Sequence, residues 1–596
     1  MTASLTTLRR MLLPAVIFVA AFVTFVPGLH GEFINWDDDV NFLGNPGFRG
    51  LDWSHLRWMA TAMHEGHWIP LSWLTLGLNY TLGGMDPFGY HLGNLAFHSA
   101  NAVLFYFAAR RLLGSAGAAA GEPALSWGAA GAALLFAVHP LRVESVVWMT
   151  ERRDVQSMFF FLLSALGYLR AVAEGRNGRL HSLWRRLSVA AFVCAFLSKS
   201  STIMLPAALL LLDVYPLRRT SLGWRRLIVE KIPYFLLAAA DFAVAWIAVQ
   251  RAARMTGLAV HGLAGRIAIV FYSFFYYPWR LTWPVALSPM YEMPQRVDPL
   301  QPRFLVPFLL VVVITAALVA LRRRWPAGLC AWTYSALMVL PLSGVVHIGF
   351  QLVQDRWSYL SGLGFEVLAG GGIAWLLDAR ARGRVSAVIA RSVMAGVAAI
   401  LLFLAAAAWD QSKAWQDSET LWRWGANLDP ECAVCWNNLG TALIGQKRYG
   451  EAEEAYRRVA ALRPMSGILA NNIATALHGQ RRDTEAVEML RLAVRLDPNL
   501  TGALLNLGAY EAQTGRFAEG LSHLRKAYAL DPTYFGTVKE LAWALVAAAA
   551  SERKAGHPSE ALALYQETLA VQPANAQARE GLEALSAGRP ADGARR

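Results

Sequence analysis

Cysteine is scarce in this chain, which has 4 cysteines among 596 residues. This number is too small for the disulfide framework that holds small secreted domains together. Cys194 and Cys330 lie in apolar runs, whereas Cys432 and Cys435 form a C-x-x-C. Because no second such pair is present, the sequence excludes the common four-cysteine zinc site. For Cys432 and Cys435 a disulfide and a pair of small core residues both stay open, and we favour the core pair.

Acidic residues are also few, 42 against 55 lysines and arginines, and the formal net charge is +13. A basic excess gathered on one soluble face would indicate nucleic-acid binding. Here the basic residues concentrate in short segments between long apolar runs, as in the cytoplasmic loops of membrane proteins. Apolar residues make up 55% of the chain, which has 22 tryptophans and a positive mean hydropathy. The composition therefore predicts a polytopic membrane protein that contacts a lipid bilayer and no nucleic acid.

About eleven membrane spans are predicted within residues 1–409. The first span follows Arg9 and Arg10 and has no small-residue cleavage signature, so we expect it to be retained. The others are the apolar runs near residues 91–113, 127–147 and 155–172, two short runs that meet at Ser198-Lys199, and those near 232–249, 305–321, 327–346, 358–377 and 392–409.

One apolar segment, residues 266–286, is left out of this count. If it crossed the membrane, the basic run 322–324 and every later basic loop would face away from the cytoplasm, against the positive-inside rule. We therefore expect an interfacial or re-entrant element there. The resulting topology places everything after Trp409 outside the cytoplasm.

Three consecutive carboxylates, Asp37, Asp38 and Asp39, follow the first predicted span. A solvated loop that helps to fix the topology is the simplest explanation. A general base or a ligand for a divalent cation is the alternative, because carboxylates serve both purposes. Nothing in the spacing requires a metal, so no cofactor is certain.

The composition changes after residue 410, and a repeat of 34 residues begins. Turn prolines lie at Pro430, Pro464, Pro498 and Pro532, and Pro573 follows after a seven-residue insertion. Together with small and aromatic residues in register, this period is typical of tetratricopeptide repeats, which stack into an α-solenoid. We expect the repeat groove to bind a protein or peptide, although a spacer that holds partners together fits equally well.

The predicted fold is therefore all-α, with three segments. Residues 1–409 form the polytopic membrane domain, residues 410–429 a connecting helix, and residues 430–596 the repeat domain.

The predicted topology places a set of ionisable side chains on the same outer side, several of them at span ends. Such groups at a membrane surface indicate a functional site. Arginine and lysine suit an anionic phosphate, and a carboxylate can take a proton from a hydroxyl, as transfer from a lipid-linked sugar phosphate requires. Pairing among neighbouring charges and snorkelling of Lys199 are the structural alternatives. The set is Asp37, Asp38, Asp39, Glu144, Arg152, Asp154, Lys199, Tyr291, Glu292, Asp355 and Arg356.

Several short motifs support this hypothesis by their order and placement before the repeats. They are Asp38-Asp39-Val40 with Asn45-Pro46, Trp68-x-Pro70-Leu71, Asn79-Tyr80, Gly84-x-x-Pro87-Phe88-Gly89-Tyr90-His91-Leu92-x-Asn94 and His139-Pro140-x-x-x-Glu144. With these motifs the chain resembles the transmembrane and tetratricopeptide-repeat-containing O-mannosyltransferases of the GT-C glycosyltransferase superfamily.

The resemblance implies a role for particular residues. The catalytic base is expected at Asp38 or Asp39, with Asp37 as an extra acid, and Glu144 belongs to the catalytic set. Lys199 is followed by Ser200, where the family often has glutamate, so any role of that glutamate is absent. Contacts to the donor phosphate or the substrate are expected from His91, Arg152, Asp154, Lys199, Tyr291, Asp355 and Arg356.

The implied reaction is a single inverting displacement, in which an acceptor hydroxyl attacks the anomeric carbon of a polyprenyl-phosphate sugar. Mannose is the expected sugar and a protein the expected acceptor. The topology predicts the inner membrane of a bacterium with the repeats in the periplasm, or the equivalent lumen of the endoplasmic reticulum. A non-catalytic membrane scaffold for protein assembly is the main alternative. A transporter would place its polar residues nearer the bilayer midplane.

Overall fold

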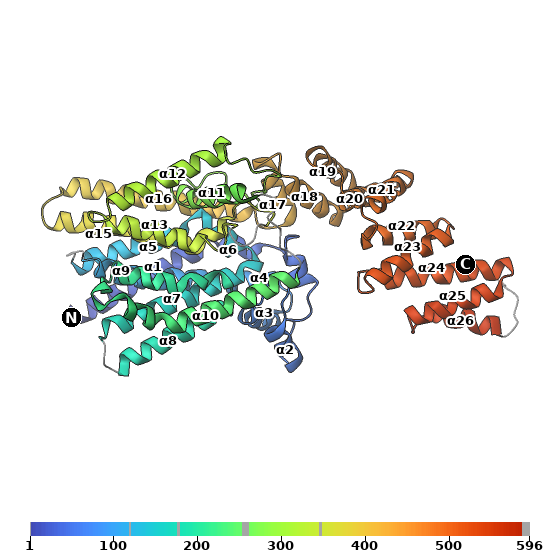
Figure 1. Cartoon of the computed structure of the whole chain (residues 1–596), viewed down its shortest axis with the longest axis horizontal. Helices are drawn as coiled ribbons and strands as arrows, with labels where there is room; N and C mark the ends of the chain where they lie inside the picture. Colours follow the sequence, from blue (N-terminus) through green and yellow to red (C-terminus); the bar gives the residue numbers. More distant parts are fainter. Residues whose placement is uncertain (1, 118–120, 176–178, 253–261, 345–348, 587–596) are drawn as a thin grey trace. The chain divides into compact units, whose positions relative to one another are not determined.

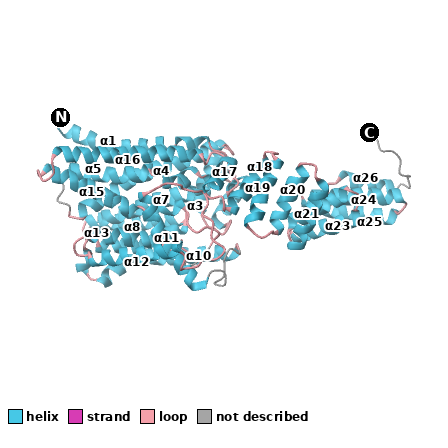
Figure 2. Cartoon of the chain, turned by 90° about the horizontal axis from the view of Figure 1, so that it is seen from above, coloured by secondary structure: helices cyan, strands magenta, loops and turns pink. Residues whose placement is uncertain are grey.

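The computed structural model describes the chain except for residues 1, 118–120, 176–178, 253–261, 345–348 and 587–596. Within the described part, regular structure is helical, and extended pairing is limited to two isolated bridges, His64 with His67 and Glu292 with Gln351 (Figure 2). The chain divides into two compact units, Met1–Asp429 and Pro430–Arg596. The predicted all-α fold class is confirmed.

The first unit is a helical bundle in which α4 packs against α5 and α7, and α5 packs against α15 (Figure 1). Its α-helices are α1 (Thr2–Thr24), α2 (Trp53–Thr61), α3 (Pro70–Gly83), α4 (Pro87–Ser115), α5 (Glu122–Val138), α6 (Val143–Val147), α7 (Arg152–Ala173), α8 (Arg179–Phe196), α9 (Leu205–Val214), α10 (Trp224–Arg251), α11 (Gly262–Thr282), α12 (Pro302–Ala320), α13 (Pro326–Val339), α14 (Ser358–Ser361), α15 (Leu363–Ala381), α16 (Ala387–Lys413) and α17 (Ser418–Leu428). Short helices of other types are η1 (Val26–His30), η2 (Asp39–Leu43), η3 (Pro140–Arg142), η4 (Met149–Glu151), η5 (Ser200–Met204), η6 (Arg219–Leu222) and η7 (Asp355–Trp357).

Four helical stretches among the described residues are long and apolar enough to cross a membrane: Met149–Ala173, α10, α12 and α16. Two bent helix pairs, Glu122–Val138 with Pro140–Val147 and Asp355–Ser361 with Leu363–Ala381, raise this number to six. The total of about eleven crossings therefore stays a prediction. α11, where we expected an interfacial or re-entrant element, does not meet these criteria of length and hydropathy, and whether it crosses the membrane also stays a prediction.

The loop after α1 folds into a core of its own, which fixes the position of the acidic triplet. Phe42, Phe48, Trp73 and Tyr90 are buried together there, with ring centroids of Phe42 and Tyr90 5.4 Å apart. Because large aromatic side chains bury extensive apolar surface, the loop is held rigidly and does not hang free in solvent.

The same loop is joined to the end of the first unit. The backbone N–H of Asn35 donates to Ser418 Oγ at 2.9 Å, and Trp422 Nε1 donates to Asn35 Oδ1 at 2.6 Å. Residues 410–429, predicted as one connecting helix, comprise the end of α16, a turn and α17. This segment thus helps to build the first unit.

The second unit consists of helix pairs in register with the predicted turns. Its helices are α18 (Ala433–Gly445), α19 (Tyr449–Leu462), α20 (Gly467–Gly479), α21 (Asp483–Leu496), α22 (Thr501–Gln513), α23 (Phe517–Leu530), α24 (Thr537–Ala555), α25 (Pro558–Val571) and α26 (Ala576–Ser586). The seven-residue insertion lengthens a first helix, since α24 has 19 residues where α18, α20 and α22 have 13.

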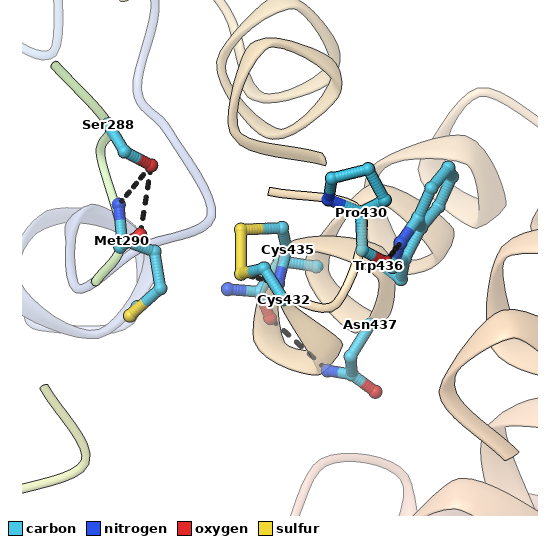
Figure 3. The surroundings of a disulfide bond; sticks show 8 residues. Ser288, Met290, Pro430, Cys432, Cys435, Trp436 and Asn437 are labelled. Carbon is cyan, nitrogen blue, oxygen red and sulfur yellow. Dashed lines mark hydrogen bonds between the residues drawn. A yellow bond between two sulfur atoms is a disulfide. The ribbon is translucent and has the colours of Figure 1, made fainter. Parts of the chain in front are cut away.

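Cys432 and Cys435 form a disulfide at the start of α18 (Figure 3). Both side chains are fully buried, and Trp436 Nε1 donates to the carbonyl oxygen of Pro430 in the same turn. The preference for a pair of reduced core residues was therefore wrong. The three-residue spacing brings the Cα atoms to 5.3 Å, well within the range that a disulfide requires.

The contact between α5 and α15 depends on two glycines. A Cβ added to Gly128 would lie 2.5 Å from the carbonyl oxygen of Gly370, and one added to Gly370 would collide in turn with the backbone of Gly128. Small residues of this kind let helices approach closely in membranes, where van der Waals packing drives their association.

We therefore expect Gly370→Ala to lower the melting temperature of the full-length protein in detergent, because the obstructing atoms are backbone and cannot rotate away. Overpacking of this kind typically costs about 1–3 kcal/mol. Gly372→Ala is the matched control, since it lies on the same helix with no atom within 4 Å of an added Cβ. Equal melting of the two variants would show that the close approach is not required.

Candidate active site at the loop end of the membrane unit

The centre of the candidate site is Glu151, whose side chain is completely buried. Arg153 donates to Glu151 Oε1 at 2.9 Å, and Lys199 Nζ lies 2.7 Å from Oε2. Arg356 Nε lies 3.3 Å from Oε1. The three cations come from α7, from the turn before η5 and from η7. One carboxylate therefore joins three segments that are far apart in the sequence.

Further acids complete the charge balance around these cations. Lys199 Nζ also lies 2.6 Å from Asp154 Oδ1. Glu144 accepts from the backbone N–H of Arg356 at 2.9 Å and from its guanidinium. Three cations therefore face three carboxylates in an environment with little solvent, which satisfies the requirement that buried charges be paired.

Asp355, which precedes Arg356, accepts hydrogen bonds from two tyrosines. Tyr276 Oη donates to Asp355 Oδ1 at 2.8 Å, and Tyr291 Oη donates to the same oxygen at 3.1 Å. Because Tyr276 lies on α11, this helix contributes to the candidate site.

An aromatic wall borders the cations. The guanidinium carbon of Arg356 lies 5.1 Å from the ring centroid of Trp148 and 6.0 Å from that of Trp36. Trp36 and Trp148 stack with their centroids 4.6 Å apart. Cation–π attraction over a stacked pair holds the guanidinium in a defined orientation.

The acidic triplet presents three different environments. Asp38 is fully buried; its Oδ1 accepts from Thr150 Oγ1 at 2.6 Å, and its Oδ2 accepts from the Ile34 N–H at 3.2 Å. Burial raises the pKa of Asp38 to about 8, although these hydrogen bonds favour the charged form. Asp38 therefore connects the loop to η4 and is mostly protonated at pH 7.

Asp39 and Asp37 differ from Asp38 and from each other. Asp39 is exposed, and its carboxylate accepts from the N–H of Val40. Asp37 is half-buried and has φ of 62°, a left-handed conformation that costs energy for a residue with a Cβ. Within the described residues no hydrogen bond or ion pair to the Asp37 carboxylate is formed, yet its charge lies within range of Arg153. The three carboxylates consequently do not converge.

The geometry does not fit the divalent cation that the triplet suggested. Asp38 spends both oxygens on protein donors, and among the described residues no group of three or more His, Cys, Asp or Glu is placed to hold a metal ion.

Two expected substrate contacts lie away from Glu151. Arg152 is buried and donates to Asn94 Oδ1 at 2.6 Å and to Asn79 Oδ1 at 2.9 Å. His91 is also buried, with Nε2 3.2 Å from the carbonyl oxygen of Gly31. In this structure the motif residues Asn79 and Asn94 position Arg152, and His91 contacts the backbone at the end of η1.

The structure brings together Glu144, Asp154, Lys199, Tyr291, Asp355 and Arg356 from the predicted set. It adds Glu151, Arg153, Tyr276 and His67, which lies within electrostatic range of Arg153, Lys199 and Glu151. The run of four charged residues, Glu151-Arg152-Arg153-Asp154, was the available signal for the first two. They could not show which arginine points inward.

These features define a helical membrane protein with an ion cluster at one end and an array of tetratricopeptide repeats. Residues 437–501 and 500–574 match two family models, each described as tetratricopeptide repeat. The repeat assignment made from the 34-residue period is therefore confirmed.

The chain is also similar to proteins named protein O-mannosyl-transferase, which confirms the predicted resemblance. It is 33% identical over 183 residues to Tmtc1 of Drosophila melanogaster, covering 29% of this chain and 20% of the relative. It is 32% identical over 197 residues to TMTC4 of Homo sapiens, covering 31% and 26%. The chain thus spans about a fifth to a quarter of the length of these curated relatives.

Among solved structures, the chain is similar to YrrB, described as a TPR protein with an unusual peptide-binding site. The identity is 21%, the TM-score is 0.23, and the match covers 28% of this chain and 81% of that one. At this TM-score nothing further follows from the match.

We expect Glu151→Gln to lower the free energy of unfolding by about 3–5 kcal/mol, because three buried or nearly buried cations lose their shared counter-charge. Thermal unfolding of the full-length protein in detergent measures the effect. Asp154→Asn is the control and should cost less, since Asp154 pairs with Lys199 alone among the cations of the site. A Glu151→Gln variant that melts like the parent would contradict the central role of Glu151.

Proposed function

We propose that this protein is an integral-membrane glycosyltransferase that moves a sugar, with mannose the first candidate, from a polyprenyl-phosphate donor to a hydroxyl of a protein acceptor. The observation that carries the proposal is the joining of Arg153, Lys199 and Arg356 on one buried carboxylate, in a chain similar to O-mannosyl-transferases. A cluster of fixed cations is what a departing phosphate needs, because it stabilises the negative charge that develops there.

Lys199 and Arg356 are the two cations best placed to meet the donor phosphate. Their side chains are 16% and 10% exposed, against 8% for Arg153. Both are already paired with acids, so the phosphate competes with Glu144, Glu151 and Asp154 for them. Pairing with these acids keeps the two cations oriented when no donor is bound, and it lowers the affinity for the donor.

We assign the general base to Asp37. Of the three acids, Asp38 is buried and hydrogen-bonded, and Asp39 is exposed, with its carboxylate accepting from the N–H of Val40. Asp37 alone combines partial exposure, a carboxylate without a partner in the described structure, and proximity to Arg153. Its left-handed backbone is the kind of strain that clusters at active sites.

In the proposed reaction Asp37 takes the proton of the acceptor hydroxyl as its oxygen bonds to the anomeric carbon. The bond from that carbon to the phosphate oxygen breaks, and Lys199 and Arg356 stabilise the phosphate that leaves. Because attack and departure occur on opposite faces, the anomeric configuration inverts.

The site and the repeats are proposed to face the outer side of the membrane, which is the periplasm in a bacterium or the lumen of the endoplasmic reticulum elsewhere. The disulfide between Cys432 and Cys435 supports this orientation, since disulfides persist in oxidising compartments and are rare in the cytosol.

Asp37→Asn is expected to reduce sugar transfer by about 10²-fold or more, because the amide cannot accept the proton. The assay is transfer of labelled mannose from a polyprenyl-phosphate donor to endogenous membrane proteins by the purified protein. Asp39→Asn is the matched control in the same loop and should retain activity.

If Asp37→Asn keeps full activity and Asp39→Asn loses it, the general base is Asp39. No transfer by the parent protein from any supplied donor would favour the non-catalytic scaffold, for which a balanced ion network is also expected.

The orientation is tested by the redox state of the cysteine pair in cells. In a Cys194→Ala/Cys330→Ala background, acid-quenched and denatured protein should react with maleimide at Cys432 and Cys435 only after reduction. Labelling without reduction would place the repeats in a reducing compartment. The parent protein should react at Cys194 and Cys330 in both conditions, because these cysteines are free.

A further inference from the structure

A large apolar cavity lies between five helices of the first unit. Its volume is about 650 Å³, within the range of about 300–1,000 Å³ that is common for ligand sites. The walls come from α4, α7, α9, α13 and α15, and among the described residues no charged side chain lines them. Because apolar cavities stay free of water and accept apolar ligands, we expect a hydrocarbon to occupy this one.

The cavity extends toward the end of the bundle that faces away from Glu151. On α7 its wall runs from Phe161 to Leu169, and at 1.5 Å per residue Leu169 lies about 24 Å along the helix from Arg153. Gly117, just after α4, and Trp325, just before α13, line its far end. The predicted topology places both of these helix ends on the cytoplasmic side. The cavity is therefore distinct from the candidate active site.

Cations border this far end of the cavity. Arg218 is exposed, and within the described residues its guanidinium forms no ion pair. It donates to the carbonyl oxygen of Ala116, a residue of the cavity wall, at 3.4 Å. The exposed basic run 322–324 directly precedes Trp325. Positive charge beside an apolar cavity is complementary to a molecule with an anionic head group and an apolar chain.

We propose that this cavity binds one acyl chain of an anionic phospholipid from the cytoplasmic leaflet, with the phosphate at Arg218. Basic sites between membrane helices on the cytoplasmic side bind the head groups of such lipids. The sugar donor fits this end of the cavity less well, because its phosphate is proposed to lie at Lys199 and Arg356. A bound chain supplies the dispersion contacts that an empty cavity lacks, and it thereby joins the five helices.

The first test uses Cys330, which lines the cavity, with Cys194 as the internal control, since it is also free but does not line the cavity. The rate of N-ethylmaleimide labelling of each cysteine is measured on the full-length protein in nanodiscs of phosphatidylcholine, alone or with phosphatidylglycerol of the same acyl chains. We expect phosphatidylglycerol to slow the labelling of Cys330 by about tenfold and to leave that of Cys194 unchanged.

Two outcomes of this test overturn the proposal. If phosphatidylglycerol adds no protection to that of phosphatidylcholine, the site does not recognise an anionic head group. If a polyprenyl phosphate protects Cys330 better than phosphatidylglycerol does, the cavity belongs to the donor chain. No sugar is present, so neither outcome depends on the proposed transfer reaction.

The head-group contact is tested with Arg218→Gln. Removing this cation should weaken the protection of Cys330 by phosphatidylglycerol about fivefold. Arg179→Gln is the matched control, because Arg179 is an exposed arginine at the start of α8 that does not line the cavity. Full protection in Arg218→Gln would contradict the assigned phosphate contact.

The chain is located with a phosphatidylglycerol that carries a photoreactive group at the end of one acyl chain. Irradiation should link it to peptides of α9, α13 or α15, identified by mass spectrometry, and this result decides where Cys330 fails to react. Gly371→Phe should lose the link, because Gly371 lines the cavity and an added Cβ would lie 3.4 Å from Leu113. Gly396→Phe on α16, with no atom within 4 Å of an added Cβ, is the control.

Melting temperatures report whether these variants stay folded. If Gly371→Phe does not fold, the sites of linkage in the parent protein decide. Links confined to residues outside the cavity would overturn the proposal.

Discussion

Burial of the Glu151 carboxylate is the constraint on which the first unit depends. A charge without access to water must be paired, and no single neighbour provides for both oxygens, so Arg153, Lys199 and Arg356 share it. Each cation belongs to a different segment, and satisfying Glu151 therefore fixes the positions of α7, the turn before η5 and η7. The same requirement gathers three cations, balanced by Glu144, Glu151 and Asp154, at one place.

The first loop shows how backbone conformation divides chemically identical residues. Asp38 accepts from Thr150 and from the Ile34 N–H, whereas Asp37 adopts a φ of 62°. The aromatic core around Phe42 and Tyr90 keeps the loop in place. The Asp38 carboxyl thus secures the loop, while within the described residues the Asp37 carboxylate has no hydrogen-bond or ion-pair partner.

The two units differ in how they place charged side chains. The membrane unit buries charges and pairs them, whereas α18 and α20 of the repeat unit contain no Asp, Glu, Lys or Arg.

Local regularities of the sequence by themselves determined the all-α class, most of the apolar helices and the repeats, because hydropathy and a 34-residue period are visible without long-range contacts. They also brought Glu144, Lys199 and Arg356 into the candidate set. Tertiary structure alone decided between Arg152 and Arg153, since consecutive residues on a helix point about 100° apart and the direction of the core is not local information. Tertiary structure also decided that Cys432 and Cys435 form a disulfide, which depends on the path of the backbone between them. It decided the different environments of Asp37 and Asp38 as well, because Asp38 contacts Thr150, more than a hundred residues away, and Asp37 has a left-handed backbone.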